Sequence, residues 1–337
     1  MNHRVVITGI GVASPVYIGS DLAAFVFDSS NHNRNEYSAK IENIADSLEK
    51  HVPYNILRRM CRFSQLALYS NILCWKDAQI SIKEENERIG SIMNTSYGPL
   101  DVTENLLKTL IQSGPQAVSP SDFSNTVNNC ATGQVSMYLG LKGVSTTLIS
   151  SSAITYGYDL IKQGKAEAIF VSGVEEVNDN VCDIMKDNGF QIMEHSCCVL
   201  LEDYEHAVKR NAKIYSEILD CNISYGMDEG LLQNTLIQEQ YQKITLSNNA
   251  INLEHFLNEA NQLNMFDSNK LFYHVLGATE IINVICAAIF LKEKRWIKNI
   301  SQEIEQLDLK EEEKVVSVSL QHGNCYSLVK QGGVNHV

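Results

Sequence analysis

The sequence predicts an α/β fold, in which strands and helices alternate along the chain. The clearest evidence is residues 143–173, where a strand at 146–149, a sharp turn, a helix at 153–163 and a strand at 166–171 follow one another. The second strand is rich in Ile, Phe and Val, which is typical of a strand buried on both faces of a parallel sheet. Shorter strand and helix patterns fill the rest of the chain, and no low-complexity linker divides it.

The predicted helix at 153–163 has clear ends and one apolar face. Ile154, Gly157, Tyr158 and Ile161 recur at helical spacing, and the helix stops at Gly164. A serine, Ser151 or Ser152, is expected to cap its first turn.

This strand–turn–helix elbow is a common place for an enzyme nucleophile, because a helix N-terminus stabilises negative charge. The elbow holds only Ser150, Ser151 and Ser152, and no cysteine occurs between Cys130 and Cys182. A serine hydroxyl stays protonated near neutral pH and needs a neighbouring base to react. The elbow is therefore predicted to lack an activated nucleophile.

The remaining elements follow from apolar runs, helical spacing and turn residues. In the first half we expect strands at 4–9 and 89–93, and helices at 21–27, 58–77 and 100–112. In the second half we expect strands at 213–222, 243–246 and 271–274, helices at 251–263 and 278–291, and a closing hairpin of 315–320 with 325–330.

Composition excludes several classes of function. The chain has 337 residues, 44% of them hydrophobic, and a net charge of −13, which argues against nucleic acid as a partner. No apolar run is long enough to span a membrane, and the N-terminus enters a strand without a signal peptide, so we expect a cytoplasmic protein. Nine scattered cysteines without metal-ligand spacing predict reduced thiols, no metal site and no cofactor.

Five segments carry a resemblance to a known family: 4–16 (RVVITGIGVASPV), 58–70 (RRMCRFSQLALYS), 119–149, 156–176 and 270–278. They resemble the β-ketoacyl-ACP synthases, and the likeness extends from Arg4 to Val329. The resemblance implies the thiolase-like fold, with five αβαβα layers made of two similar halves. We expect the halves to be residues 1–205 and a shortened 206–337.

The resemblance also shows which family groups are missing. Members use one cysteine and two histidines to hold the acyl chain and stabilise the charge formed on loss of CO2. Lys270 and His274 match functional positions in the motif of the second histidine. Where the first histidine belongs, the chain reads Ser247-Asn248-Asn249-Ala250. Loss of the elbow cysteine marks chain-length-factor subunits, so we expect no catalytic residue and interpret His274 as a buried core histidine.

Two further segments have expected roles. By the resemblance, residues 119–143 cross a dimer contact towards the partner's acyl tunnel, with Phe123, Val127, Asn128 and Cys130 lining or plugging it. By periodicity alone, the same residues are an ordinary helix that packs inward. Glu194 occupies the family's structural glutamate position.

These features predict a non-catalytic ketosynthase-like subunit, a chain length factor. It would pair with an active ketosynthase and shape the tunnel for the growing β-ketoacyl chain, and an acyl carrier protein would dock mainly through that partner. One alternative is a self-sufficient acyltransferase or hydrolase that uses an elbow serine with His274. The other is an acyl-binding or structural homodimer.

Overall fold

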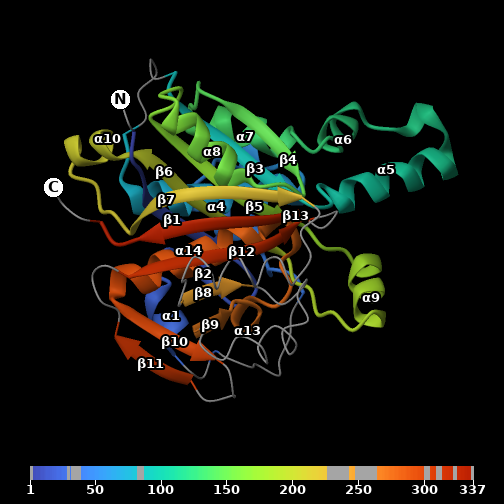
Figure 1. The fold of residues 1–337 in the computed structure, drawn as a ribbon. Coiled ribbons are helices and arrows are strands. Elements are labelled where there is room, and N and C mark those ends of the chain that lie inside the picture. The colour runs from blue at the N-terminus through green and yellow to red at the C-terminus, as the bar shows by residue number, and fades with distance from the viewer. Residues whose placement is uncertain are drawn as a thin grey trace.

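The computed structural model describes residues 3–28, 31, 39–81, 87–225, 243–246, 264–299, 304–308, 313–321 and 325–334. The described elements form a layered body, and α5 (Leu100–Ser113), α6 (Pro120–Asn125) and α9 (Asp179–Asp187) project from one side of it (Figure 1). Within these ranges, no helix is both long and apolar enough to cross a bilayer.

Two groups of strands make one 11-stranded sheet. The first group is β1 (Val5–Ala13), β3 (Ile89–Thr95), β4 (Ser145–Ile149), β5 (Ala168–Glu175) and β6 (His195–Asp203), with the short β2 (Ile18–Gly19) beside β1. The second group is β7 (Ser216–Tyr225), β8 (Lys243–Leu246), β9 (Asn264–Asp267), β12 (Lys314–Gln321) and β13 (Cys325–Gly332). A separate antiparallel pair joins β10 (Arg295–Asn299) and β11 (Ile304–Asp308).

The two groups have mirrored topology. The order is β4-β3-β5-β6-β1 and then β7-β13-β12-β8-β9, with β2 off this path. In the first group β4 lies outermost and β1 at the centre. In the second group the equivalent strands along the chain, β9 and β7, take these two places. Pairing matches as well, since the outer three strands are parallel and the inner ones antiparallel in both groups. Antiparallel pairing of β1 with β7 joins the groups. This symmetry supports two similar halves, and the boundary near residue 205 stays a prediction.

Helices cover both faces of the first group. The outer face carries α4 (Arg62–Ala78) and α7 (Cys130–Leu139), with α2 (Ile44–Glu49) and α3 (Tyr54–Leu57) nearby. The inner face carries α8 (Ala153–Lys162) and α14 (Thr279–Glu293), and both of these helices contact strands of both groups. Three small helices remain: α1 (Ala23–Phe27), α10 (Tyr204–Lys209) and α13 (Asn269–Phe272). Phe25 of α1 and Phe272 of α13 pack against each other in the core.

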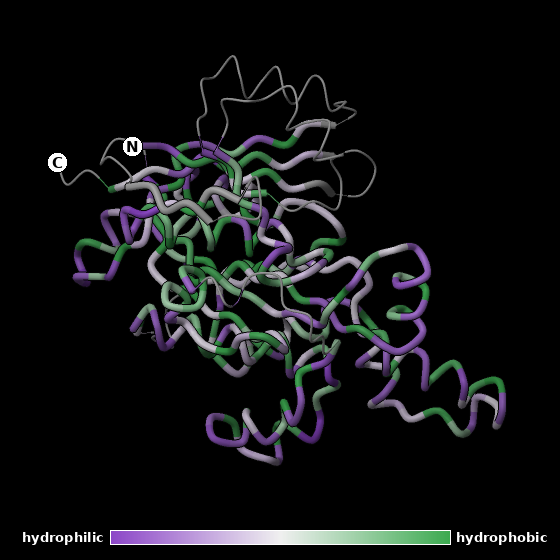
Figure 2. The backbone as a smooth tube through the Cα atoms, turned by 90° about the horizontal axis from the view of Figure 1, so that it is seen from below, coloured by the Kyte–Doolittle hydropathy of each residue, from purple (hydrophilic) through white to green (hydrophobic). Residues whose placement is uncertain are grey.

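Alternation along the strands explains why β5 reads as a continuous apolar run. Ile169 and Val171 pack with α8 and α14, whereas Ala168 and Phe170 pack with α4. Burying each of the three larger side chains, Ile169, Phe170 and Val171, stabilises the fold by about 1.5–3 kcal/mol. Hydrophobic residues concentrate in the middle of the body, whereas the projecting helices mix hydrophobic and hydrophilic residues (Figure 2).

The structure confirms most predicted elements and corrects one. Residues 271–274 are not a strand, because α13 occupies 269–272 and the neighbouring strand β9 lies earlier, at 264–267. A four-residue apolar run does not distinguish strand from helix, and here Ser268 already begins a helical turn. The predicted helix at 251–263 lies outside the described residues.

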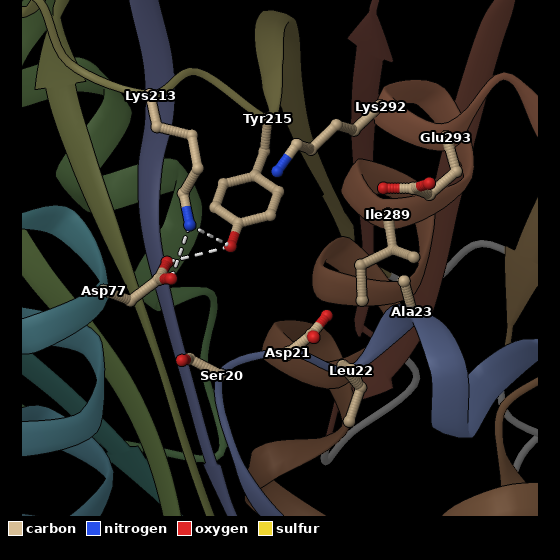
Figure 3. Close-up of a pocket in the computed structure, with 10 residues that line it drawn as sticks. All are labelled: Ser20, Asp21, Leu22, Ala23, Asp77, Lys213, Tyr215, Ile289, Lys292 and Glu293. Carbon is tan, nitrogen blue, oxygen red and sulfur yellow. Dashed lines mark hydrogen bonds and ion pairs between the residues drawn. The ribbon is translucent and has the colours of Figure 1, made fainter.

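One polar cluster ties the two halves together beside a cavity of about 100 Å³ (Figure 3). Asp77 of α4 accepts hydrogen bonds from the backbone amide of Ile10 at 3.0 Å and from the Tyr215 hydroxyl at 2.9 Å. Lys213 pairs with Asp77 at 2.5 Å, and Lys292 of α14 lies over the Tyr215 ring, 4.3 Å from its centroid. None of the residues predicted as a functional site lines this cavity.

Candidate functional site

The elbow between β4 and α8 forms where the sequence predicts it. Ser150 has a φ of 46°, a left-handed conformation that is uncommon for serine, and it turns the chain sharply from strand to helix. Its amide donates to the Thr95 carbonyl at 2.9 Å, and its hydroxyl donates to the Ser96 hydroxyl at 3.3 Å. The Ser151 amide donates to the Asn94 side chain at 3.1 Å.

Ser152 is the N-cap of α8, one of the two predicted candidates. Its hydroxyl accepts a hydrogen bond from the Thr155 amide at 3.2 Å, as an N-cap serine does. The same oxygen lies 3.1 Å from the Ser327 hydroxyl and donates to the carboxylate of Glu280. The Ser152 side chain is almost fully buried, so this hydroxyl serves the structure of the helix end.

Glu280 places a carboxyl group at the N-terminus of α8. It lies in the first turn of α14, is buried, and accepts hydrogen bonds from the Ser327 hydroxyl at 2.5 Å and the Ile154 amide at 3.3 Å. Burial raises the pKa of Glu280. The end of the helix dipole that would stabilise a nucleophile is therefore occupied by a side chain of the second half.

A second buried carboxyl group, Glu175, fixes the loop after α13 to the ends of the strands. Its side chain accepts hydrogen bonds from the amides of Gly277 at 3.0 Å and of Ser96. Burial raises the pKa of Glu175 to about 7. Asn94 adds a hydrogen bond to the Gly277 carbonyl at 2.8 Å. A Cβ at Gly277 would lie 2.4 Å from the Glu175 carboxylate, so only glycine fits there.

His274 and Lys270 do not come together as a catalytic pair. His274 is half-buried, its ring lies edge-on to Phe190 with centroids 5.0 Å apart, and its Nδ1 has no hydrogen-bond partner. Burial lowers its pKa to about 4, so the ring is neutral near pH 7. Lys270 is exposed on α13. Among the described residues, no hydrogen bond joins His274 to a serine or to a thiol.

None of the other predicted site residues that the structure describes is hydrogen-bonded to an elbow serine. Phe123 and Val127 are 63% and 47% exposed, whereas α7 of the same segment packs inward and buries Ala131, Val135 and Leu139. Asn128 fits against Gly98, where an added Cβ would meet its Oδ1. The Cys130 thiol donates to the Asn125 carbonyl at 3.4 Å. Asn248 and Asn249 lie outside the described residues.

Glu194 has the structural role expected of it. Its buried carboxylate accepts from Arg62 Nε at 2.6 Å and Arg62 Nη2 at 2.7 Å, and from the Ile41 amide at 2.8 Å. This fork-to-fork pair is the strong form of a buried ion pair. It fixes the first turn of α4 to the turn that precedes β6.

Four backbone amides at the elbow are already engaged in hydrogen bonds within the protein: those of Ser150, Ser151, Ile154 and Thr155. Catalysis of acyl transfer needs such donors free to meet developing charge. In the described part of the chain, no three His, Cys, Asp or Glu side chains are grouped to hold a metal ion.

Sequence reasoning missed Glu280 and Asn94 as members of this site. Glu280 could have been noticed because it is a charged residue in the first turn of α14, a helix whose middle is almost entirely apolar. Asn94 lies near the end of a fully buried strand, where a polar side chain needs a partner.

Comparison with known proteins identifies the family. A family model described as "Beta-ketoacyl synthase, N-terminal domain" matches residues 25–197, about half of the chain. The chain belongs to the beta-ketoacyl synthase family. The match covers all of α8, the elbow and the segments around Glu175 and Glu194.

Curated members of the beta-ketoacyl synthase family include similar sequences. One is the 3-oxoacyl-[acyl-carrier-protein] synthase 2 of Staphylococcus aureus, 29% identical over 265 residues. The synthase of the same name from Vibrio cholerae is 27% identical over 266 residues. In both, the match covers 67% of this chain and 63% of the relative, so the chain spans less than two thirds of these relatives' length.

Solved structures confirm the thiolase-like ketosynthase fold. The ishigamide ketosynthase/chain length factor matches with a TM-score of 0.83 and 16% identity, covering 99% of this chain and 100% of that one. A beta-ketoacyl synthase from Burkholderia phymatum matches over the same shares with a TM-score of 0.82 and 18% identity. A type II polyketide synthase ketosynthase in complex with its acyl-carrier protein gives a TM-score of 0.78 at 15% identity, again over 99% and 100%.

Proposed function

We propose that this chain is a non-condensing ketosynthase-like subunit, a chain length factor, that pairs with an active ketosynthase. The observation that carries the proposal is the elbow itself. It has no thiol, its Ser152 hydroxyl caps α8, and the carboxyl group of Glu280 occupies the helix end. A decarboxylating condensation needs a thiolate and free donors at this point, and the elbow supplies neither.

The curated relatives are named synthases, so retained condensing activity is the main competing function. Family membership alone does not assign activity, because function depends on the site and not on the fold. His274 is the one family histidine position that this chain retains, and its imidazole touches Phe190 instead of a nucleophile. The elbow without a thiol, capped by Ser152 and Glu280, therefore favours a non-condensing role over the activity that the relatives' names describe.

The projecting side of the molecule supports pairing with another subunit. α5 has no buried residue, and it exposes Leu107, Leu110 and Ile111. Phe123 and Val127 add to this exposed apolar surface, and β4 forms one edge of the described sheet. Exposed apolar groups of this extent favour a protein partner, and one matched structure is described as a ketosynthase/chain length factor.

Under this proposal the chain acts by shape. Residues of the 119–143 segment, including Phe123, Val127, Asn128 and Cys130, would close the tunnel that receives the growing β-ketoacyl chain. Closely packed side chains at the end of the tunnel cannot move enough to admit one more ketide unit. The open volume of the tunnel therefore sets the length of the β-ketoacyl chain. With a net charge of −13, the chain is a poor docking surface for an acidic carrier protein, which would bind mainly to the partner.

One observation favours the alternative of serine chemistry. Ser150 holds a left-handed φ at a strand-to-helix turn, and such strain is common at functional positions. Its hydroxyl, however, donates to Ser96, and no base lies against it among the described residues. Intact-mass measurement after incubation with an acyl thioester tests this alternative: an adduct lost in Ser150→Ala would support it.

The proposal is tested by expressing the chain alone and together with a complete ketosynthase from the same genome. Each preparation is given malonyl- and acyl-carrier protein, and ketoacyl products are measured. We expect no condensation by the isolated chain and a stable complex with the ketosynthase. Condensation by the isolated chain overturns the proposal, and failure to co-purify with any ketosynthase favours a homodimer.

A further inference from the structure

A pair of cysteines outside the elbow lies where the N-termini of two helices meet. Cys61 is the N-cap of α4, and Cys130 is the first residue of α7. Both thiols are half-buried and free of disulfides. Each Sγ lies 3.5 Å from the hydroxyl oxygen of Ser64, which is thus a shared hydrogen-bonding partner.

A second shared acceptor holds the two thiols in place. The backbone carbonyl of Asn125 lies 3.4 Å from Cys130 Sγ and 3.9 Å from Cys61 Sγ. Asn125 is itself fixed, because its side chain donates to the Arg59 carbonyl at 3.1 Å and accepts from Gln134 at 3.1 Å. The two sulfur atoms are therefore neighbours in a preformed site, although 69 residues separate them in the sequence.

The surroundings favour a thiolate on Cys61. The neighbouring Cys130 thiol, together with Ser64 and the amides of the first turn of α4, lowers the pKa of Cys61 despite burial. The same interaction raises the pKa of Cys130. This division resembles that of a reactive thiol and its resolving partner, and a helix N-terminus is an established cause of such acidity. The buried Glu176 nearby does not oppose the thiolate at neutral pH, because burial raises its pKa to about 9.

Cys61 is also accessible to a small reagent. It lines a surface cavity of about 300 Å³ together with Arg58, Arg59 and Arg62. Asp101 and Asp122 line the same cavity, so its rim carries charges of both signs. By contrast, Cys197 and Cys198 are fully buried in β6, and burial raises the pKa of Cys197.

We propose that Cys61 and Cys130 form a redox-active dithiol, in which Cys61 reacts with a small hydroperoxide and Cys130 then closes a reversible disulfide. In the first step the Cys61 thiolate attacks one peroxide oxygen, the O–O bond breaks, and the leaving hydroxide takes a proton to become water. In the second step Cys130 attacks the sulfenic sulfur, the S–O bond breaks, and the thiol proton leaves with hydroxide as water. Two thiols and one hydrogen peroxide thus give one disulfide and two waters.

The first test uses the full reduced chain and needs no mutation. Iodoacetamide labelling at pH 7, followed by peptide mapping, compares Cys61 with Cys182, which is also half-buried. We expect Cys61 to be labelled roughly tenfold faster. Equal rates, or faster labelling of Cys182, would overturn the proposal.

The second test follows the oxidised product. Treatment with one equivalent of hydrogen peroxide should lower the intact mass by about 2 Da, link the peptides of Cys61 and Cys130, and be reversed by dithiothreitol. In Cys130→Ser, which keeps a hydrogen-bonding group beside Cys61 but cannot form a disulfide, the sulfenic acid on Cys61 should be trapped by dimedone, whereas Cys182→Ala should behave as the wild type. Oxidation that links other cysteines, or leaves Cys61 unmodified, contradicts the assignment. Because the dithiol is separate from the elbow, neither result depends on whether the chain condenses acyl groups.

Discussion

The hydroxyl of Ser152, which caps α8, donates a hydrogen bond to the carboxyl group of Glu280 in the first turn of α14. The two residues are 128 positions apart and come from the two groups of strands and helices. This contact joins the two central helices at the point where a reactive group would stand. The elbow is thus part of the contact between α8 and α14, and so between the two halves.

Replacing Glu280 by alanine should therefore destabilise the protein strongly. The change removes the acceptor of two buried hydroxyl groups, Ser152 and Ser327, and of the Ile154 amide. We expect a loss of roughly 3–5 kcal/mol in the free energy of unfolding, measured by urea denaturation. Glu205→Ala is the matched control, since Glu205 is an exposed first-turn acid of α10 and its loss should cost less than about 1 kcal/mol. Equal effects of the two changes would show that the Glu280 contacts are unimportant.

Two glycines should respond in opposite directions to alanine. A Cβ at Gly277 would lie 2.7 Å from the Ser96 amide nitrogen, which is backbone and cannot move aside. Gly277→Ala should destabilise the protein by roughly 3 kcal/mol. Gly133, inside α7, has open space at its Cβ position, so Gly133→Ala should stabilise by about 0.5–1 kcal/mol. Thermal unfolding of both variants measures the sign directly, and a stable Gly277→Ala protein would contradict the tight loop described above.

Glu176 should make stability fall as the pH rises. Its carboxyl oxygens are buried without hydrogen-bond partners, and burial raises its pKa to about 9. Between about pH 4.5 and 9 the folded protein holds this proton while the unfolded chain has released it, so folding becomes less favourable with increasing pH.

Glu176→Gln removes this titration. We expect the variant to gain roughly 3 kcal/mol relative to the wild type on going from pH 5 to pH 8, measured by denaturant unfolding at each pH. A pH profile of Glu176→Gln parallel to that of the wild type would refute the assignment.

Phe123 should matter for assembly and not for the stability of the isolated chain. Because its side chain is 63% exposed, Phe123→Ala should change the free energy of unfolding by less than about 0.5 kcal/mol. If α6 faces the ketosynthase, the same change should weaken the complex by about tenfold or more, as loss of an aromatic anchor does. Tyr54→Ala, at a side chain that is 68% exposed on α3, is the control and should not alter binding. Titration of the partner onto each variant distinguishes these outcomes.

Local sequence was sufficient to predict α8. Its apolar residues Ile154, Tyr158 and Ile161 are buried, and the serine cap and the Gly164 stop lie where capping preferences place them. The family resemblance supplied the fold, which local patterns could not. Conversely, the short apolar run at 271–274 misled, since strand and helix periodicity do not differ over four residues.

The candidate site was only partly predictable. The missing thiol can be read from the sequence, but the partner that fills the helix end cannot, because Glu280 and Ser152 are brought together by tertiary packing alone. The same holds for Cys61 and Cys130, whose proximity depends on how α4 packs against α7. Exposure of Phe123 likewise follows from the projection of α6 out of the body (Figure 1).

The most direct test of the central claim is a condensation assay with the purified chain, the separate ketosynthase, and the two combined. If the elbow is closed by Ser152 and Glu280 as described, the chain alone forms no β-ketoacyl product, and the combination forms product whose length changes when Phe123 or Val127 is replaced. Malonyl-dependent product from the chain alone, above that of a heat-denatured sample, would contradict the account.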